Sequence, residues 1–130
     1  MGYPAHKSCY ATAMTIILRL FAWGLAAAIA FATLGPAEQR PHSNLGQNGE
    51  HALAFVLLGL AFGLAPARSR WLTAAFVIAF TGLIEVLQFW APGRHARLQD
   101  FLVDALAASL GLVAAVALDW TIRRTQRSLP

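Results

Sequence analysis

The sequence predicts an all-α integral membrane protein, a bundle of four transmembrane helices. Of its 130 residues, 58% are apolar and only 12% are charged, whereas a soluble domain is about 45–50% apolar and about 25% charged. A soluble domain of this size has too large a surface to cover with so few charges. Four apolar stretches approach the length of about 20 residues that a bilayer-spanning helix needs. We therefore expect a single membrane domain over residues 1–130.

The bounds of the four helices follow from where each apolar run begins and ends. The first contains Arg19 as its only charge and stops at Gly35-Pro36, and the second stops at Pro66. The third and fourth have aromatic residues at both ends, which suit the two headgroup layers. An amphipathic surface helix is excluded for the third because residues 71–83 are apolar on all sides. The predicted helices cover about residues 14–34, 51–65, 71–90 and 101–120.

The basic residues predict the orientation. With four crossings, one side of the membrane carries Lys7, Arg19, Arg68, Arg70, Arg123, Arg124 and Arg127, and the other carries only Arg40, Arg94 and Arg97. Lys and Arg accumulate in cytoplasmic loops. Both termini are therefore expected in the cytoplasm, with the loops 38–50 and 91–100 outside. An alternative for the N-terminal segment is a signal peptide that ends in an Ala-x-Ala cleavage site within residues 28–32.

Charge and cysteine content exclude two other classes. The net charge is +4, but no basic stretch is interleaved with aromatic residues on a polar background, so a nucleic-acid partner is not expected. Cys9 is the single cysteine, which rules out an internal disulfide framework and a zinc site of Cys/His spacing.

Ionisable side chains within the apolar stretches are the strongest indication of function, because charges inside a span are costly and usually face the bundle interior. Glu85 and Gln88 are three residues apart, and Asp100 and Asp104 are four apart, so each pair shares one helix face. A short loop joins these two helices, which makes them antiparallel neighbours whose acidic residues reach similar depths. We expect one outer vestibule that gathers Glu50, His51, Glu85, Gln88, Asp100 and Asp104.

The loop between the third and fourth helices adds basic groups to this vestibule. Pro92-Gly93 favours a tight reversal, and it is followed by Arg94 and Arg97. Their guanidinium groups suit either the neutralisation of the carboxylates or bidentate binding of a phosphate.

Several of these residues also have structural interpretations. Glu85 could pair with Arg94 only to stabilise helix ends, and Asp100 could be the N-cap of the fourth helix. Arg19 is expected to snorkel toward the cytoplasmic headgroups, and Asp119 to form a boundary salt bridge with Arg123. Close helix packing is the expected role of Gly59, Gly63 and Gly111.

The polar residues and their order resemble the VanZ-like family of small bacterial membrane proteins. The resemblance covers about residues 16–118 and rests on the run from Glu50 to Gly59, on Ile84-Glu85-Val86-Leu87-Gln88, on Pro92-Gly93-Arg94 and on Asp100. The signature polar residues of the family fall on His51, Glu85, Gln88, Arg94 and Asp100. The chain departs from the family pattern at Gln47-Asn48, where Asp-Lys is frequent, and at Asp104, where Asn is usual. Asp104 thus adds a second carboxylate.

The resemblance implies a multi-pass protein of the bacterial inner membrane, and the family's namesake is associated with teicoplanin resistance. It does not imply a particular reaction, and whether this chain is an enzyme stays open.

The leading hypothesis is an outward-facing site that binds or acts on a cell-envelope component, namely a lipid-linked phosphate, a peptidoglycan precursor or a glycolipid head group. The candidate catalytic residues are His51, Glu85, Asp100 and Asp104. The candidate ligand-binding residues are Glu50, Gln88, Arg94 and Arg97. The carboxylates have two alternative roles, as a general base or as ligands of a divalent cation such as Mg²⁺. His51 is the candidate proton shuttle, because imidazole exchanges protons near neutral pH.

Two other hypotheses belong to different classes. In the first, the protein is a non-enzymatic structural or interaction protein whose polar cluster locks helix ends. In the second it is a transporter, which four spans and nearly apolar inner halves disfavour.

Overall fold

The computed structural model describes residues 5–35, 46–91 and 97–128. Within these ranges the chain forms four α-helices and no strand, which confirms the predicted helical bundle. The elements are α1 (Ala5–Leu34), α2 (Gly46–Leu64), α3 (Arg70–Leu87), the short 3₁₀ turn η2 (Gln88–Trp90) and α4 (Leu98–Ser128).

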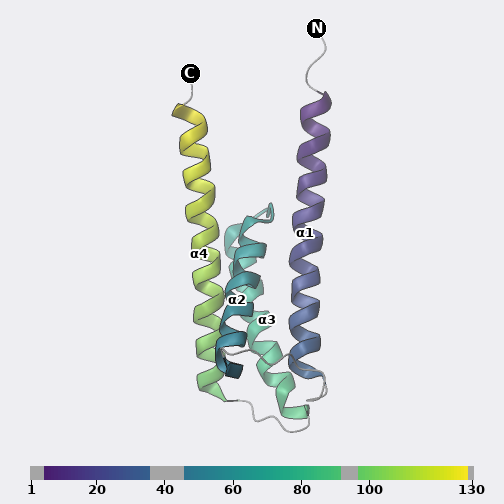
Figure 1. Cartoon of the computed structure of the whole chain (residues 1–130), viewed down its shortest axis with the longest axis vertical. Coiled ribbons are helices and arrows are strands. Elements are labelled where there is room, and N and C mark those ends of the chain that lie inside the picture. Colours follow the sequence, from purple (N-terminus) through teal and green to yellow (C-terminus); the bar gives the residue numbers. More distant parts are fainter. Residues whose placement is uncertain (1–4, 36–45, 92–96, 129–130) are drawn as a thin grey trace.

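The helices alternate in direction, so helix ends from different parts of the chain lie together at the two ends of the bundle (Figure 1). At one end, called here the Asp104 end, α2 begins, α3 ends and α4 begins. At the opposite end, called the Asp119 end, α1 begins, α2 connects to α3 and α4 ends. The α2–α3 connection stops well short of the first turns of α1 and the last turns of α4 (Figure 1).

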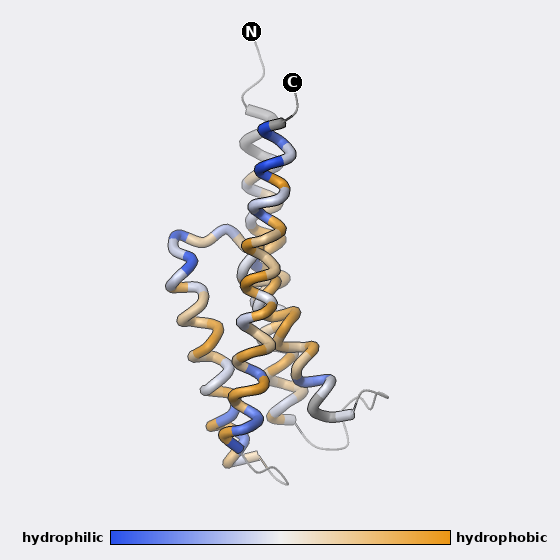
Figure 2. The backbone as a smooth tube through the Cα atoms, turned by 90° about the vertical axis from the view of Figure 1, so that its left-hand side faces the viewer, coloured by the Kyte–Doolittle hydropathy of each residue, from blue (hydrophilic) through white to orange (hydrophobic). Residues whose placement is uncertain are grey.

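Length and hydropathy fit three of the helices to a membrane. Tyr10–Leu34, Arg70–Trp90 and Leu98–Arg127 are long and apolar enough to cross one, and α2 contains the shorter apolar segment Gly49–Leu64. Figure 2 shows apolar residues along the middle of the helices and hydrophilic residues toward their ends. Large apolar side chains such as Trp71, Leu72 and Leu110 are exposed on the sides of the bundle. Lipid, rather than water, is the solvent that suits such a surface.

The helices extend beyond the apolar runs that defined the predicted spans. α1 begins at Ala5 rather than at Met14, and α4 continues to Ser128 rather than ending at Trp120. The physical reason is that hydropathy sets the part of a helix that enters lipid, whereas the helix itself continues until Pro, Gly or a cap stops its hydrogen bonding.

Glycines allow α2 and α4 to pack with their backbones in contact. A Cβ atom at Gly59 would overlap the carbonyl group of Ala108, and one at Gly111 would overlap backbone atoms of Val56 and Leu60. The expected packing role of these glycines is confirmed, and Gly63 similarly contacts α4 at Ala115. This helix pair is the most extensive contact in the bundle. It fixes the register that brings the beginnings of α2 and α4 together at the Asp104 end.

The remaining helices pack around this pair through apolar side chains. Phe55 and Leu58 of α2, Val77 and Ile84 of α3 and Ala108 of α4 are buried in one core cluster. α1 contributes Ala26 and Ile29 to this cluster. Its partly exposed Trp23 also has its ring centroid 5.5 Å from that of Phe62 and 5.3 Å from that of Phe76. Aromatic pairs at these separations stabilise a packed interface beyond the burial of their area.

Candidate functional site

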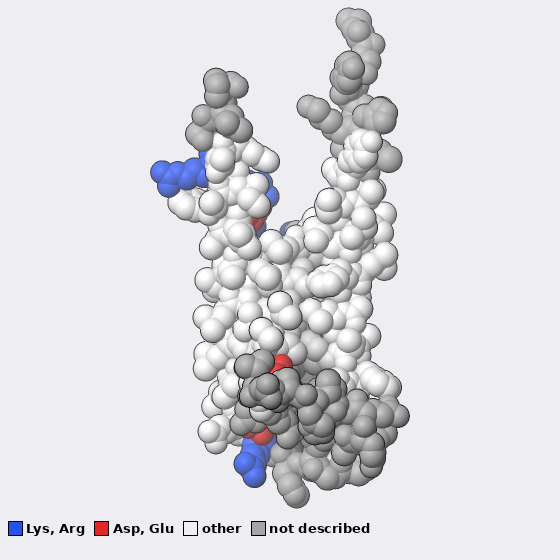
Figure 3. Space-filling view, in the orientation of Figure 1, with Lys and Arg blue, Asp and Glu red and all other residues white. Residues whose placement is uncertain are grey.

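A cluster of buried polar side chains lies at the Asp104 end of the bundle. Glu85 and Gln88 come from the end of α3 and the η2 turn, Asp104 comes from the second turn of α4, and His51 comes from the first half of α2. Glu85, Gln88 and Asp104 are buried, and His51 is half-buried. We call these four residues the polar cluster. On the visible face of the molecule, charged side chains gather toward the two ends and the middle is uncharged (Figure 3).

Both carboxylate oxygens of Glu85 accept hydrogen bonds. The backbone N–H of Arg97 donates to Oε1 at 2.8 Å, and the Gln88 side-chain amide donates to Oε2 at 3.0 Å. The first bond joins the end of α3 to the residue that precedes α4. The Glu85 side chain therefore holds the backbone of Arg97 in place, while the Arg97 side chain is exposed.

His51 and Asp104 face each other across the α2–α4 interface. Nδ1 of His51 lies 3.6 Å from Oδ2 of Asp104, and the two side chains are 22% and 6% exposed. This separation is longer than a hydrogen bond, but it allows an ion pair when the imidazole is protonated. The carboxylate lies on the buried side of the pair and the imidazole on the accessible side. A carboxylate beside Nδ1 favours the tautomer whose Nε2 accepts protons.

The acidic residues form one electrostatic group. Asp100, Asp104 and His51 are all close enough to Glu85 for their charges to act on its carboxylate. Several carboxylates in a site bounded by apolar helices produce a negative potential, so an anionic ligand would bind here only beside guanidinium groups that offset it. Among the side chains that the structure describes, no three His, Cys, Asp or Glu residues are placed to hold a metal ion.

Comparison with known proteins identifies the family. A family model described as VanZ/LLP1 matches residues 5–119, from the first turn of α1 to the last third of α4. The chain belongs to the VanZ-like family. The resemblance drawn from the polar motifs is thus confirmed. Neither curated proteins nor solved structures give a match.

The VanZ signature residues are brought together in part. His51, Glu85 and Gln88 lie in the polar cluster, while Asp100 is half-buried in the first turn of α4. Arg94 and the Pro92-Gly93 reversal lie outside the described residues. Glu50 is half-buried beside His51 at the start of α2.

The suggestion that Asp100 is the N-cap of the fourth helix is wrong. α4 already begins at Leu98, so Asp100 lies inside the first turn, where its backbone N–H donates to the Arg97 carbonyl at 3.0 Å. The apolar run that predicts the helix start begins only at Phe101. The expected cap was therefore placed too far along the chain. A carboxylate in the first turn still interacts favourably with the helix dipole.

A second group of charges lies at the Asp119 end. The expected bond between Asp119 and Arg123 is present, with Arg123 Nε donating to Oδ1 at 2.9 Å. Arg70, at the start of α3, donates to the other carboxylate oxygen of Asp119 at 2.5 Å. Helical spacing does not predict Arg70 as a partner, because it is 49 residues from Asp119 in the sequence. Arg19 reaches the same end, where it donates to the Pro66 carbonyl at 2.9 and 3.3 Å instead of only extending to the headgroups.

Proposed function

We propose that this VanZ-family protein binds the polar head group of a cell-envelope component at the Asp104 end. The candidate ligands are a lipid-linked phosphate, a peptidoglycan precursor and a glycolipid head group. The proposal places the protein in the bacterial inner membrane with both termini in the cytoplasm, as the distribution of Lys and Arg indicates. The Asp104 end then faces outward, where these ligands are found.

The observation that carries this proposal is the burial of ionisable groups at one end of an apolar bundle. Glu85 and Asp104 are buried among membrane helices, where apolar side chains of similar volume would join the helices without the cost of dehydrating charges. Ionisable groups retained in such positions usually serve a ligand or a proton pathway.

The geometry supports a division of roles within the site. His51 is the accessible member of its pair with Asp104, so Asp104 orients the imidazole and His51 exchanges protons with a ligand through Nε2. Arg97, whose backbone is fixed by Glu85, binds the anionic group together with Arg94. A guanidinium group suits this role because it can donate two parallel hydrogen bonds to two oxygens of one phosphate. Under this proposal Glu85 is a positioning residue and Gln88 supports its orientation.

A binding measurement tests the proposal directly. The purified protein in detergent is titrated with a polyprenyl phosphate, a lipid-linked peptidoglycan precursor or a diacyl glycolipid, and binding is followed by thermophoresis. We expect His51→Gln and Arg97→Gln each to weaken binding of one of these probes about tenfold, which corresponds to about 1.4 kcal/mol. The exposed neighbour Gln99 provides the control, and Gln99→Ala should bind as the unaltered chain does. Absence of binding by all three probes, or equal binding by all variants, would refute the proposal.

A second candidate function, a structural or interaction protein, is favoured by one observation. The Glu85 bond to the Arg97 backbone and the His51–Asp104 pair both join neighbouring helix ends, as expected if the cluster only locks those ends and presents the loops to a partner. This function requires folding and not proton exchange. The variant His51→Gln, which removes proton exchange but leaves the Glu85 bond to the Arg97 backbone intact, should then retain function, whereas a ligand site should lose it.

The family's association with teicoplanin resistance extends the proposal to a cellular effect. Expression of this protein in a teicoplanin-susceptible bacterium should change the inhibitory concentration of teicoplanin if the bound component is one that the antibiotic requires. The His51→Gln variant, expressed to the same level, separates the two candidate functions. Loss of the effect favours the ligand site, and retention favours the structural function.

A further inference from the structure

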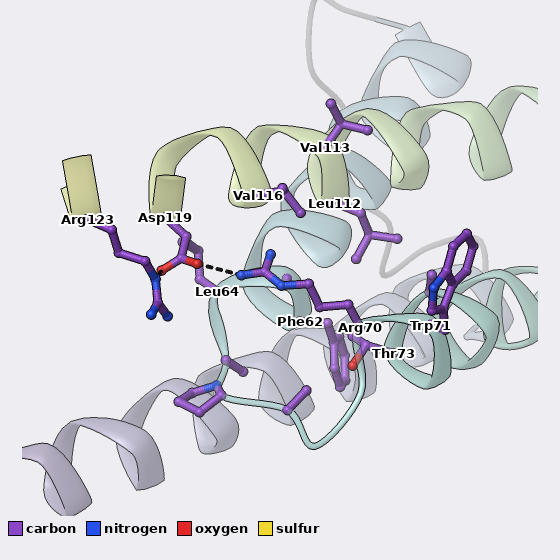
Figure 4. A pocket seen from close by; sticks show the side chains of 15 residues that line it. Phe62, Leu64, Arg70, Trp71, Thr73, Leu112, Val113, Val116, Asp119 and Arg123 are labelled. Carbon is purple, nitrogen blue, oxygen red and sulfur yellow. Dashed lines mark hydrogen bonds and ion pairs between the residues drawn. The ribbon is translucent and has the colours of Figure 1, made fainter. Parts of the chain in front are cut away.

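A pocket at the Asp119 end is separate from the polar cluster. Its volume is about 780 Å³, within the range of ligand-binding pockets. The walls come from the end of α2, the start of α3 and the second half of α4 (Figure 4). They combine apolar side chains with three charged ones. The apolar residues include Phe62, Leu64, Leu112, Val113 and Val116, and the charged residues are Arg70, Asp119 and Arg123.

The charged side of the pocket has an excess of positive charge. Figure 4 shows Arg70 and Arg123 approaching the Asp119 carboxylate from opposite sides. Two guanidinium groups carry ten N–H donors between them, far more than one carboxylate accepts, and one net positive charge is left. Arg70 and Arg123 are also 54% and 67% exposed, so their charge is accessible from the pocket opening. Phosphate oxygens are the partners that such paired guanidinium groups favour.

The depth of these charges matches a headgroup layer. Asp119 lies about 27 Å along α4 from Phe101 at 1.5 Å per residue, close to the thickness of about 30 Å of the hydrocarbon core. Trp120 follows it, and Arg124 lies over the Trp120 ring at 5.2 Å from its centroid. An aromatic residue beside basic residues is typical of the membrane interface. Leu112, Val113 and Val116 precede Asp119 on α4 and therefore lie on the hydrocarbon side of the charges.

We propose that this pocket binds an anionic phospholipid. Its phosphate contacts Arg70 and Arg123 in the headgroup layer, and one acyl chain lies along Leu112, Val113 and Val116. A free phosphate would use the charged side and leave the apolar walls uncovered. A zwitterionic lipid would bring a cationic group against two arginines, so an anionic lipid is favoured. This site does not depend on the function proposed for the Asp104 end.

Trp71, which lines the pocket, provides the experimental signal. Because Trp71 is also exposed to the surrounding lipid, the pocket is measured by the difference in quenching between two lipids and not by the quenching itself. In a chain with Trp23, Trp90 and Trp120 replaced by Phe, its fluorescence reports contact with lipids that carry brominated acyl chains. The protein is placed in phosphatidylcholine vesicles that contain equal fractions of brominated phosphatidylglycerol or brominated phosphatidylcholine. We expect quenching to show about fivefold stronger association of phosphatidylglycerol, the factor expected for one arginine near an anionic lipid. Equal quenching by the two lipids would overturn the proposal.

Variants locate the preference within the pocket. Arg123→Gln should reduce the preference for phosphatidylglycerol to near one, and Arg123→Lys should retain part of it. Arg127 supplies the matched control, because it is exposed in the last turn of α4 and does not line the pocket. If Arg127→Gln lowers the preference as much as Arg123→Gln does, diffuse surface charge is responsible and the site is refuted.

A soluble competitor separates a lipid from a free phosphate. Glycerol 3-phosphate added in large excess should leave the quenching by brominated phosphatidylglycerol unchanged, because it lacks the acyl chain. Its displacement of the lipid would show a simple phosphate site and contradict the proposal. This measurement uses the chain with both arginines intact, so it holds even if a substituted variant does not fold.

Discussion

The two ends of the bundle use carboxylates in opposite ways. At the Asp104 end, Glu85 and Asp104 are buried, and acidic groups predominate among the residues that the structure describes. At the Asp119 end, a single carboxylate is shared by two exposed arginines and the charge is positive. Both arrangements join neighbouring helices through polar contacts. They differ in how much water is removed from the charged groups.

This difference determines how much each end contributes to stability. A buried polar group that loses its partner leaves the other group dehydrated and unsatisfied, which costs far more than the contact itself contributes. An exposed ion pair that is broken returns both charges to solvent and costs little. We therefore expect the Asp104 end to tolerate few substitutions and the Asp119 end to tolerate many.

The largest expected effect comes from separating the two helices that contribute to both ends. Gly59→Leu would force a side chain into the backbone of α4 at Ala108. Because neither backbone can move without displacing the His51–Asp104 pair or the pocket, we expect a loss of about 3 kcal/mol in the free energy of unfolding. Unfolding in mixed micelles of increasing denaturing detergent measures this change.

Gly24 on α1 offers the matched control for this substitution. A Cβ atom there would meet no other atom within 4 Å, so Gly24→Leu should leave the free energy of unfolding almost unchanged. Equal losses in the free energy of unfolding for the two variants would show that the added side-chain volume alone destabilises the protein. The backbone contact between α2 and α4 would then not be the cause.

The contrast between the ends also explains what could be predicted from the sequence. Hydropathy predicted four helices, and helical spacing predicted the i,i+4 bond between Asp119 and Arg123. The partner Arg70 was missed because contacts between helices depend on rotation and register, which are set by packing of residues such as Gly59 and Gly111. For the same reason His51 and Asp104 were assigned to one vestibule but not paired.

The helix ends were harder to predict than the spans. The interpretation of Asp100 as a cap failed because the helix start was inferred from the apolar run. Leu98 and Gln99 extend α4 before that run begins. The distinction between an apolar run and a helix matters most at the Asp104 end, because the candidate site is formed by helix ends.

The next largest effect tests burial at the Asp104 end. Glu85→Ala removes the acceptor of the Arg97 backbone N–H and of the Gln88 amide, so we expect a loss of about 2 kcal/mol in the free energy of unfolding. Gln99→Ala, an exposed change in the first turn of α4 at the same end, should lower it by less than about 0.5 kcal/mol. A similar small loss for both variants would remove the contrast between a buried and an exposed end.

A smaller effect concerns the interaction of His51 with Asp104. A double-mutant cycle with His51→Gln and Asp104→Asn isolates their coupling, which we expect at about 1 kcal/mol for contacting residues in one polar network. A coupling near zero would show that the two side chains do not interact across the α2–α4 interface, despite their separation of 3.6 Å.

The smallest effect is expected at the Asp119 end. A cycle with Arg70→Gln and Asp119→Asn should give a coupling below about 1 kcal/mol, because both side chains are substantially exposed. Raising the NaCl concentration from about 0.05 to about 0.5 M should reduce this coupling, since salt screens exposed charges. The His51–Asp104 coupling should change less over the same range, because Asp104 is buried. Equal salt sensitivity at the two ends would mean that water reaches Asp104 as readily as Asp119, and the electrostatic distinction between the ends would be lost.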